Sequence, residues 1–128
     1  MTVLLDTHTF IWLDAEPAKL SPQAARLIAD PMNRVLLSVA SVWELVIKVA
    51  TGKLILRDDV GTVVESQVTQ NTVDLLEIRG DHALAVAILP NIHKDPFDRM
   101  LAAQTMIEGA VLLTADPVFQ QYPIRTDW

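Results

Sequence analysis

HKDPFDRMLAA, residues 93–103, is the stretch around which the chain is organised, and it has the marks of a helix start. Asp95 is a favourable N-cap, because its side-chain oxygen can accept hydrogen bonds from backbone N–H groups two and three residues later. Pro96 suits the first helical position, where its missing N–H costs nothing. Asp98 follows in the first turn, where the helix dipole favours a carboxylate. We therefore predict a helix that begins at Pro96 and carries two acids at its N-terminus.

Composition indicates a single globular domain over residues 1–128. A chain of 128 residues can bury a core, and 51% hydrophobic with 20% charged residues is typical of a folded chain rather than a disordered one. The absence of cysteine excludes a disulfide framework, a thiolate metal site and a thiol nucleophile. It also suits a reducing compartment, so we expect a cytoplasmic protein.

Charge and hydropathy argue against three further classes. No basic segment followed by an apolar run and a small-residue cleavage site opens the chain, so we do not expect secretion. The apolar run 35–50 is interrupted by Glu44 and Lys48 and is too short to span a membrane. The net charge of −6 argues against a broad basic surface that coats nucleic acid. It is compatible with an enzyme that holds nucleic acid through a few local contacts and a bound cation.

Short apolar segments alternate with segments of helical periodicity along the whole chain. Residues 2–5 have the low polarity of a strand that is buried on both faces of a parallel sheet. This alternation predicts an α/β fold with a mostly parallel central sheet flanked by helices, in which ligands bind beyond the carboxyl ends of the strands. The predicted strands are 2–5, 34–38, 72–78, 110–114 and 124–128, and the predicted helices are 7–14, 21–29, 40–51, 58–70, 82–89, one from Pro96 and a short one after Asp116.

Four acids are expected at one edge of this sheet. Asp6 and Asp116 each follow a predicted strand at its carboxyl end, and Glu44 lies in the second turn of the helix that leaves the second strand. Strand-to-helix junctions of a parallel sheet share one edge, so these three carboxylates should lie on the same side. Asp98 joins them if its helix also begins there.

Each acid taken alone also has a purely structural interpretation. Asp6 and Asp116 can act as N-caps, Asp98 can reach back to the N-cap of its own helix, and Glu44 can form an exposed pair with Lys48 worth a few tenths of a kcal/mol. Taken together, carboxylates about 5 Å apart repel by roughly 3 kcal/mol per pair at an effective dielectric near 20. Such a cluster requires a divalent cation or raised pKa values. Oxygen ligands favour Mg²⁺ or Mn²⁺.

Four segments resemble the PIN-domain ribonucleases, and in particular the VapC toxins of bacterial and archaeal toxin–antitoxin pairs. The resemblance implies a PIN-like fold and metal-dependent hydrolysis of RNA phosphodiester bonds by a metal-activated water, with no His or Ser nucleophile. Together the segments extend over nearly the whole chain in the order and spacing of the family. They are Leu4–His8, Ser38–Leu45, His93–Gln104 and Leu112–Asp116.

The same resemblance implies roles for individual residues. Asp6, Glu44, Asp98 and Asp116 match the acidic quartet that binds Mg²⁺ or Mn²⁺ in this family. Two threonines, Thr114 and less securely Thr7, match positions that support the metal site. Asp95 is either a ligand or the helix cap, and we assign it as the cap.

Partners follow from the resemblance as well. VapC toxins form homodimers and are neutralised by a VapB-type antitoxin, whose tail lies across the acidic site. The complex binds DNA through the antitoxin, so we expect DNA binding by this chain only indirectly.

Other polar and aromatic residues near these segments have two interpretations each. Arg99 and Lys48 are candidate contacts to substrate phosphate; the alternatives are a structural role for Arg99 and a simple ion pair for Lys48. His8 can touch substrate or lie on a helix surface, whereas His82 and His93 are predicted to be structural or to face solvent. Two tryptophans, at positions 12 and 43, are predicted in the core or a subunit interface rather than stacked on bases.

Three other classes also place an aspartate near the end of a first strand, or share this fold. A haloacid-dehalogenase-type phosphatase needs a second aspartate two residues after Asp6, where this chain has His8. A response-regulator receiver domain needs paired acids after its first strand and a late lysine, and neither is placed correctly. A non-catalytic PIN-family module for protein binding or regulation stays open as the alternative, although four intact acids argue against it.

Overall fold

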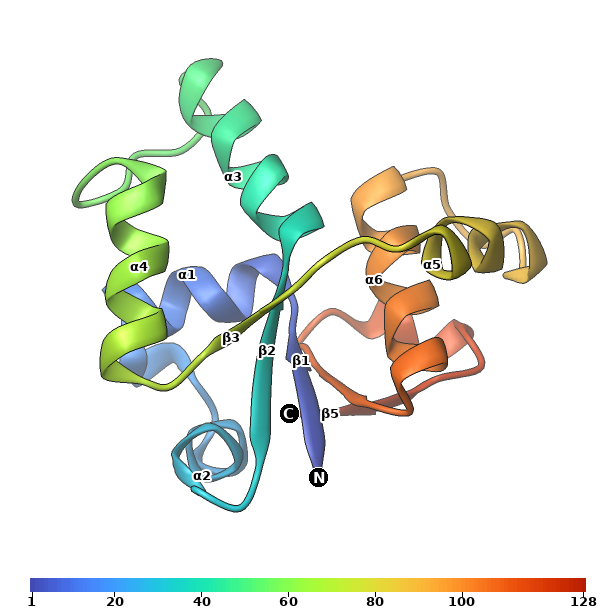
Figure 1. Ribbon diagram of the computed structural model, residues 1–128, viewed down its shortest axis with the longest axis horizontal. Coiled ribbons are helices and arrows are strands. Elements are labelled where there is room, and N and C mark those ends of the chain that lie inside the picture. The colour runs from blue at the N-terminus through green and yellow to red at the C-terminus, as the bar shows by residue number, and fades with distance from the viewer.

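A five-stranded sheet in the order β3-β2-β1-β4-β5 forms the centre of the computed structural model, which describes residues 1–128 (Figure 1). All four neighbouring pairs are parallel, so the predicted mostly parallel sheet is confirmed and is parallel throughout. Leu5 of the central strand is in register with Leu37 on one side and Leu113 on the other. The strands are β1 (Thr2–Leu5), β2 (Arg34–Ser38), β3 (Asp74–Leu76), β4 (Val111–Leu113) and β5 (Arg125–Asp127).

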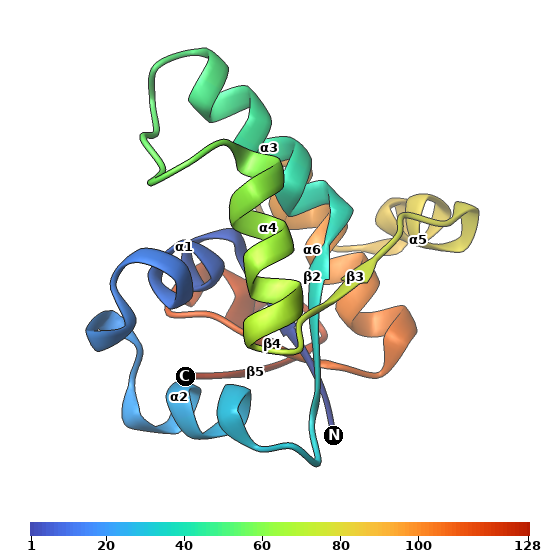
Figure 2. The same cartoon turned by 60° about the vertical axis from the view of Figure 1, so that its left-hand side comes forward.

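Helices cover both faces of this sheet. Figures 1 and 2 show α1, α3 and α4 grouped on one side of the strands and α5 and α6 on the other. The helices are α1 (Thr7–Ala15), α2 (Pro22–Ala29), α3 (Val39–Ala50), α4 (Val60–Gln70), α5 (Gly80–Ala85) and α6 (Pro96–Glu108), with short 3₁₀ turns η1 (Pro17–Lys19), η2 (Val86–Ile88) and η3 (Pro117–Gln121).

The two faces of the sheet carry separate hydrophobic cores, because successive side chains of a strand point in opposite directions. Val3 and Leu5 pack with Phe10 of α1 and Leu45 of α3 in one core. Leu4 packs in the other, among residues of α5, α6 and η3. Both faces of β1 are therefore dry from Val3 onward, which explains the low polarity of that strand.

The predicted start of α6 is confirmed. Asp95 is its N-cap and accepts hydrogen bonds from the backbone N–H groups of Phe97 at 2.9 Å and Asp98 at 3.1 Å. At the other end Gly109 adopts a left-handed conformation with φ of 61°, which a glycine accepts without strain, and the chain then enters β4. The local chemistry of these few residues thus defines where α6 begins and ends.

Three predicted elements differ most from the structure in extent or type, and the bounds of several others differ by one or two residues. The strand predicted at 72–78 is only Asp74–Leu76, because this edge strand pairs with β2 over three residues. The helix predicted at 82–89 begins at Gly80 and continues as a 3₁₀ turn after Ala85. The short helix after Asp116 is also a 3₁₀ turn.

No helix has both the length and the apolarity needed to cross a bilayer.

Candidate active site

The carboxyl ends of β1 and β4, together with α3 and the start of α6, surround a cavity of about 210 Å³. The parallel sheet brings to this edge all four acids predicted from the sequence, including Asp98, for which the sequence left the position of its helix open. The nine lining residues are Asp6, Thr7, His8, Glu44, Lys48, Asp95, Asp98, Asp116 and Phe119.

Asp6 uses both carboxylate oxygens within the protein. It is buried and caps α1, where Oδ1 accepts from the backbone N–H of Thr9 at 2.7 Å. Oδ2 accepts a hydrogen bond from the hydroxyl of Thr114, and the oxygen of that hydroxyl accepts from the backbone N–H of Asp116 at 3.0 Å. Thr114 therefore ties Asp6 to the segment that carries the second acid. Asp116 is itself an N-cap, with Oδ1 accepting from the N–H of Val118.

Glu44 is buried rather than exposed, which its interpretation as a surface ion pair did not anticipate. Its Oε1 lies 2.6 Å from the hydroxyl of Thr7, which is also 3.0 Å from the hydroxyl of Ser41. Its Oε2 forms an ion pair with Lys48 at 2.9 Å. Glu44 and Lys48 both line the cavity, so the pair joins a half-buried cation to a buried acid.

The side chain of Asp98 contacts a histidine rather than the N-cap of its own helix. Oδ2 lies 3.1 Å from Nε2 of His93, whose Nδ1 lies 2.6 Å from the hydroxyl of Tyr122. An ionised carboxylate offers only acceptors, so a neutral His93 carries its proton on Nε2 and accepts from Tyr122. The imidazole thus has a fixed tautomer and orientation.

Burial raises the pKa of Asp98 to about 6. The hydrogen bond and charge of His93 act in the opposite direction, while the neighbouring carboxylates of Asp95 and Glu44 raise the pKa further. A positive charge placed near this carboxyl group would stabilise its ionised form.

The lining residues suit a hard divalent cation in their chemistry. Five carboxylates surround the cavity, and Lys48 is the one lysine or arginine among the residues that line it. No three His, Asp or Glu side chains of the chain are grouped as a ready metal site. Mg²⁺ does not need such a group, because it keeps several waters and is often held by one or two carboxylates. Oxygen donors without sulfur favour Mg²⁺ or Mn²⁺ over softer ions.

Arg99, a candidate phosphate contact in the sequence, does not line the cavity. Its guanidinium donates to the backbone carbonyls of Pro90 at 2.9 Å and Val86 at 3.2 Å, and lies 3.4 Å from the Tyr122 hydroxyl. These contacts favour the structural interpretation, in which Arg99 holds the segment before α6 against that helix. We therefore withdraw it from the site, whereas Lys48 keeps both of its interpretations.

His93 is the residue that the sequence reasoning missed. Both His82 and His93 are predicted to be structural or to face solvent. His82 is fully buried with Nε2 3.0 Å from Glu108, and His93 is partly exposed, but its contact with Asp98, one of the predicted site acids, is not anticipated by the sequence. The one available signal was position, because His93 lies just before the N-cap of the helix that carries Asp98. Position alone does not show where an imidazole points.

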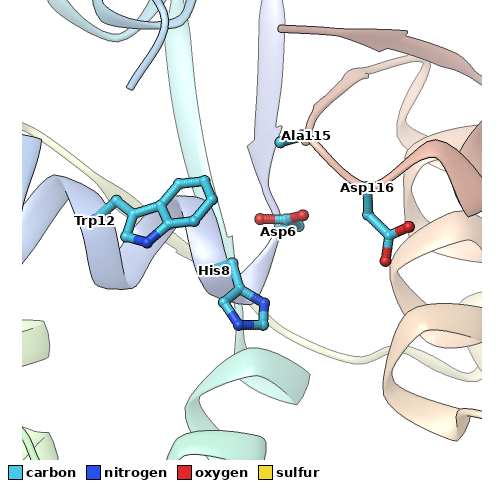
Figure 3. A pocket seen from close by; sticks show the side chains of 5 residues that line it. All are labelled: Asp6, His8, Trp12, Ala115 and Asp116. Atoms are coloured by element: carbon cyan, nitrogen blue, oxygen red, sulfur yellow. The ribbon is translucent and has the colours of Figure 1, made fainter. Parts of the chain in front are cut away.

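The two tryptophans considered above are not core residues. Trp43 is 59% exposed and meets Phe97 edge-on at 5.3 Å between ring centroids. Trp12 is partly exposed and lines a second cavity of about 260 Å³ together with Asp6, His8, Ala115 and Asp116 (Figure 3). The prediction of a core position is wrong for both, and an interface role stays a prediction.

Comparisons with known proteins agree with this architecture. The family model for the PIN domain matches residues 3–124. Comparison with curated proteins gives no significant match.

Several solved structures share the fold. The chain is similar to VapBC2 from Rickettsia felis bound to a promoter DNA fragment, with 14% identity, a TM-score of 0.76, and 99% and 98% of the two chains covered. It is similar to VapBC-1 from nontypeable Haemophilus influenzae, with 20% identity, a TM-score of 0.69 and coverage of 99% and 97%. For FitAcB from Neisseria gonorrhoeae the values are 21%, 0.60, and 97% and 95%. At these identities the likeness establishes the fold.

Proposed function

The chain belongs to the PIN-domain family, and on this premise we propose that it is a metal-dependent endoribonuclease, the toxin of a VapBC-type toxin–antitoxin pair. The observation that carries the proposal is the convergence of Asp6, Glu44, Asp98 and Asp116 on one cavity. They come from four separate segments of the sequence, and only the parallel topology brings them to the same edge. PIN domains are generally nucleases, which makes hydrolysis of a nucleic-acid backbone the natural use of this edge.

In this proposal the four acids hold Mg²⁺ or Mn²⁺. When bound, the cation supplies an activated water and screens the charge on the scissile phosphate. The protein's own contribution is orientation. Thr114 fixes one oxygen of Asp6, and Thr7 fixes one oxygen of Glu44, so that these carboxylates reach the cavity in defined rotamers. Without a cation, the carboxylates of the cavity would repel a substrate phosphate. Binding of the cation and binding of the substrate are therefore coupled in this proposal.

Lys48 is the proposed contact to substrate phosphate. Its ammonium pairs with Glu44 in the structure and lies at the rim of the cavity. With Glu44 engaged as a metal ligand, the ammonium of Lys48 would be available to pair with a phosphate oxygen. We also propose that the chain acts in the cytoplasm, in agreement with a sequence that contains no cysteine.

The proposed partners follow from the premise and from the similar complexes. VapBC2 from Rickettsia felis was solved bound to a DNA fragment from its promoter, and FitAB was solved bound to an IR36 DNA fragment. We propose a VapB-type antitoxin for this chain, a homodimer of the chain itself, and DNA contact only through the antitoxin. The net charge of −6 agrees with a chain that does not itself bind duplex DNA.

The test is cleavage of a panel of structured and single-stranded RNAs by the purified chain with Mg²⁺, with Mn²⁺ and with EDTA. The substitutions Asp6→Asn, Glu44→Gln, Asp98→Asn and Asp116→Asn should each lower cleavage by at least a hundredfold while the circular dichroism spectrum is kept. Glu65→Gln is the matched control, because Glu65 is exposed on α4 and lines no part of the cavity. Its cleavage should equal that of the parent chain.

The alternative is a non-catalytic PIN module that binds or regulates another protein. It is favoured if the parent chain cuts no RNA of the panel under any metal condition, or if the four substitutions leave a weak cleavage unchanged. The latter result would indicate a contaminating nuclease.

A further inference from the structure

The second cavity, of about 260 Å³, adjoins the acidic one, since Asp6, His8 and Asp116 line both. The remaining walls are the indole of Trp12 and the small side chain of Ala115. Figure 3 shows Trp12 and His8 on one side of Asp6 and Asp116 on the other. A flat aromatic surface therefore lies directly beside the carboxylates that we propose as cation ligands.

The indole is held in place by its neighbours. Trp12 lies on α1, one turn after His8, and the centroids of the two rings are 6.0 Å apart with an interplanar angle of 49°. Trp128, after the last strand, contacts it with centroids 5.6 Å apart at 56°. Aromatic pairs at these separations are mutually attractive. These two contacts favour one orientation of the indole in the absence of a ligand.

We propose that this second cavity is a nucleobase subsite, in which one base next to the phosphate at the acidic cavity stacks on Trp12 with its edge toward His8. This inference rests on the proposed function and names the part of the substrate that the chain recognises. Single-stranded RNA is recognised largely by stacking of unpaired bases on aromatic side chains.

Size and charge favour a base over other occupants. The cavity is smaller than the roughly 300–1,000 Å³ of pockets for drug-sized ligands, so one ring system is a better fit than a larger ligand. Lys48 is the one lysine or arginine that lines the acidic cavity, so direct side-chain contacts to phosphate are few. Stacking of a base on the neighbouring indole is therefore a further source of affinity at this edge.

The test uses nucleoside monophosphates, which contain no phosphodiester bond to cut. Binding of AMP, GMP, CMP and UMP in the presence of Mg²⁺ is compared with binding of ribose 5-phosphate, which lacks the base, by NMR titration. We expect at least one nucleotide to bind about fivefold to a hundredfold more tightly than ribose 5-phosphate, from the usual strength of base–aromatic stacking. The indole Nε1–H signal of Trp12 should shift with that nucleotide and not with ribose 5-phosphate.

Variants then assign the preference to one side chain. Trp12→Leu should remove the advantage of the base and leave binding of ribose 5-phosphate unchanged, whereas Trp12→Phe should retain part of it. Trp43→Leu is the matched control, since it removes another exposed indole that lies outside the cavity, and should bind like the parent chain. If Trp12→Leu does not fold, the indole shift in the parent chain and the partial loss in Trp12→Phe decide the question.

Equal binding of nucleotides and ribose 5-phosphate by the parent chain, or an unchanged base preference in Trp12→Leu, would overturn the subsite. The outcome is separable from the proposed function. RNA cleavage without a base preference removes the subsite and leaves the nuclease, whereas a base preference without cleavage leaves a nucleotide-binding module.

Discussion

The Nε2 atom of His93 lies 3.1 Å from Oδ2 of Asp98, and the other ring nitrogen lies 2.6 Å from the Tyr122 hydroxyl. The imidazole therefore links a carboxylate at the start of α6 to a residue that follows η3. Neither contact is local in the helix. Together they orient an acid whose neighbours on the other side, Asp95 and Glu44, are also acids.

Removing this histidine should change the ionisation of Asp98. His93→Ala deletes the interaction that lowers the pKa of Asp98, so the midpoint should rise above its value of about 6. His93→Gln can still donate a hydrogen bond and should leave the midpoint closer to that of the parent. The measurement is a carboxyl carbon NMR titration of Asp98, and a midpoint that does not rise in His93→Ala would contradict the assigned hydrogen bond.

The stability of the cation-free protein should fall as pH rises through 6. The folded-state pKa of Asp98, about 6, is above its ordinary value of 3.8, so protonation favours the folded state. This contribution is fully present below pH 4 and is lost as pH rises through 6. The resulting change in the free energy of unfolding should be roughly 2 kcal/mol, less than the full pKa difference implies, because the carboxyl group is partly exposed. Urea unfolding in EDTA between pH 4 and pH 7 measures it, and Asp98→Asn, which cannot titrate, should show a weaker dependence.

Added Mg²⁺ should oppose that loss above pH 6. A cation bound to the acidic cavity stabilises the folded state by an amount set by its concentration relative to Kd. The thermal midpoint at pH 7.5 should therefore rise with Mg²⁺ and should rise much less at pH 5, where Asp98 is protonated. Asp6→Asn should blunt the effect at pH 7.5, and an equal rise in Asp6→Asn and Glu65→Gln would mean that the ion acts elsewhere.

The hydroxyl of Thr114 should matter for both stability and activity. Thr114→Val removes the donor to Asp6 and the acceptor for the backbone N–H of Asp116. Leaving buried groups unpaired costs about 1–3 kcal/mol, and the proposed nuclease should lose activity with it. Thr114→Ser keeps the hydroxyl and should restore most of both. Equal unfolding midpoints for the valine and serine variants would show that these hydrogen bonds contribute little.

Substitutions of Arg99 and Lys48 should distinguish a cationic side chain that supports the fold from one that binds substrate. Arg99→Ala frees two backbone carbonyls, those of Pro90 and Val86, and should lower the free energy of unfolding by about 1–3 kcal/mol. At a temperature where it is folded, it should bind RNA like the parent chain. Lys48→Ala should weaken RNA binding, with a smaller loss of stability because its ammonium is at the rim. The reverse pattern would return Arg99 to the site.

The general plan of the fold could be predicted because its signals are local. Asp95 and Pro96 define a helix start through the conformation and hydrogen bonding of their own few residues, and the structure has α6 at that place. A segment of low polarity such as residues 2–5 predicts a strand that is buried on both faces. Leu4 and Leu5 do pack in opposite cores. Shorter elements were less predictable. The extent of β3 depends on how far β2 offers it a partner, which no local pattern encodes.

A shared edge for Asp6, Glu44 and Asp116 could be inferred from the order and polarity of the segments, since every strand-to-helix junction of a parallel sheet lies on the same side. The contacts that each side chain makes at that edge depend on how the folded chain packs. His93 contacts Asp98, and Arg99 donates to backbone carbonyls outside the cavity. Trp12 lines the second cavity beside Asp6. The physical reason is that topology follows from the period and polarity of segments, whereas the direction of a side chain follows from its rotamer and from partners distant in the sequence.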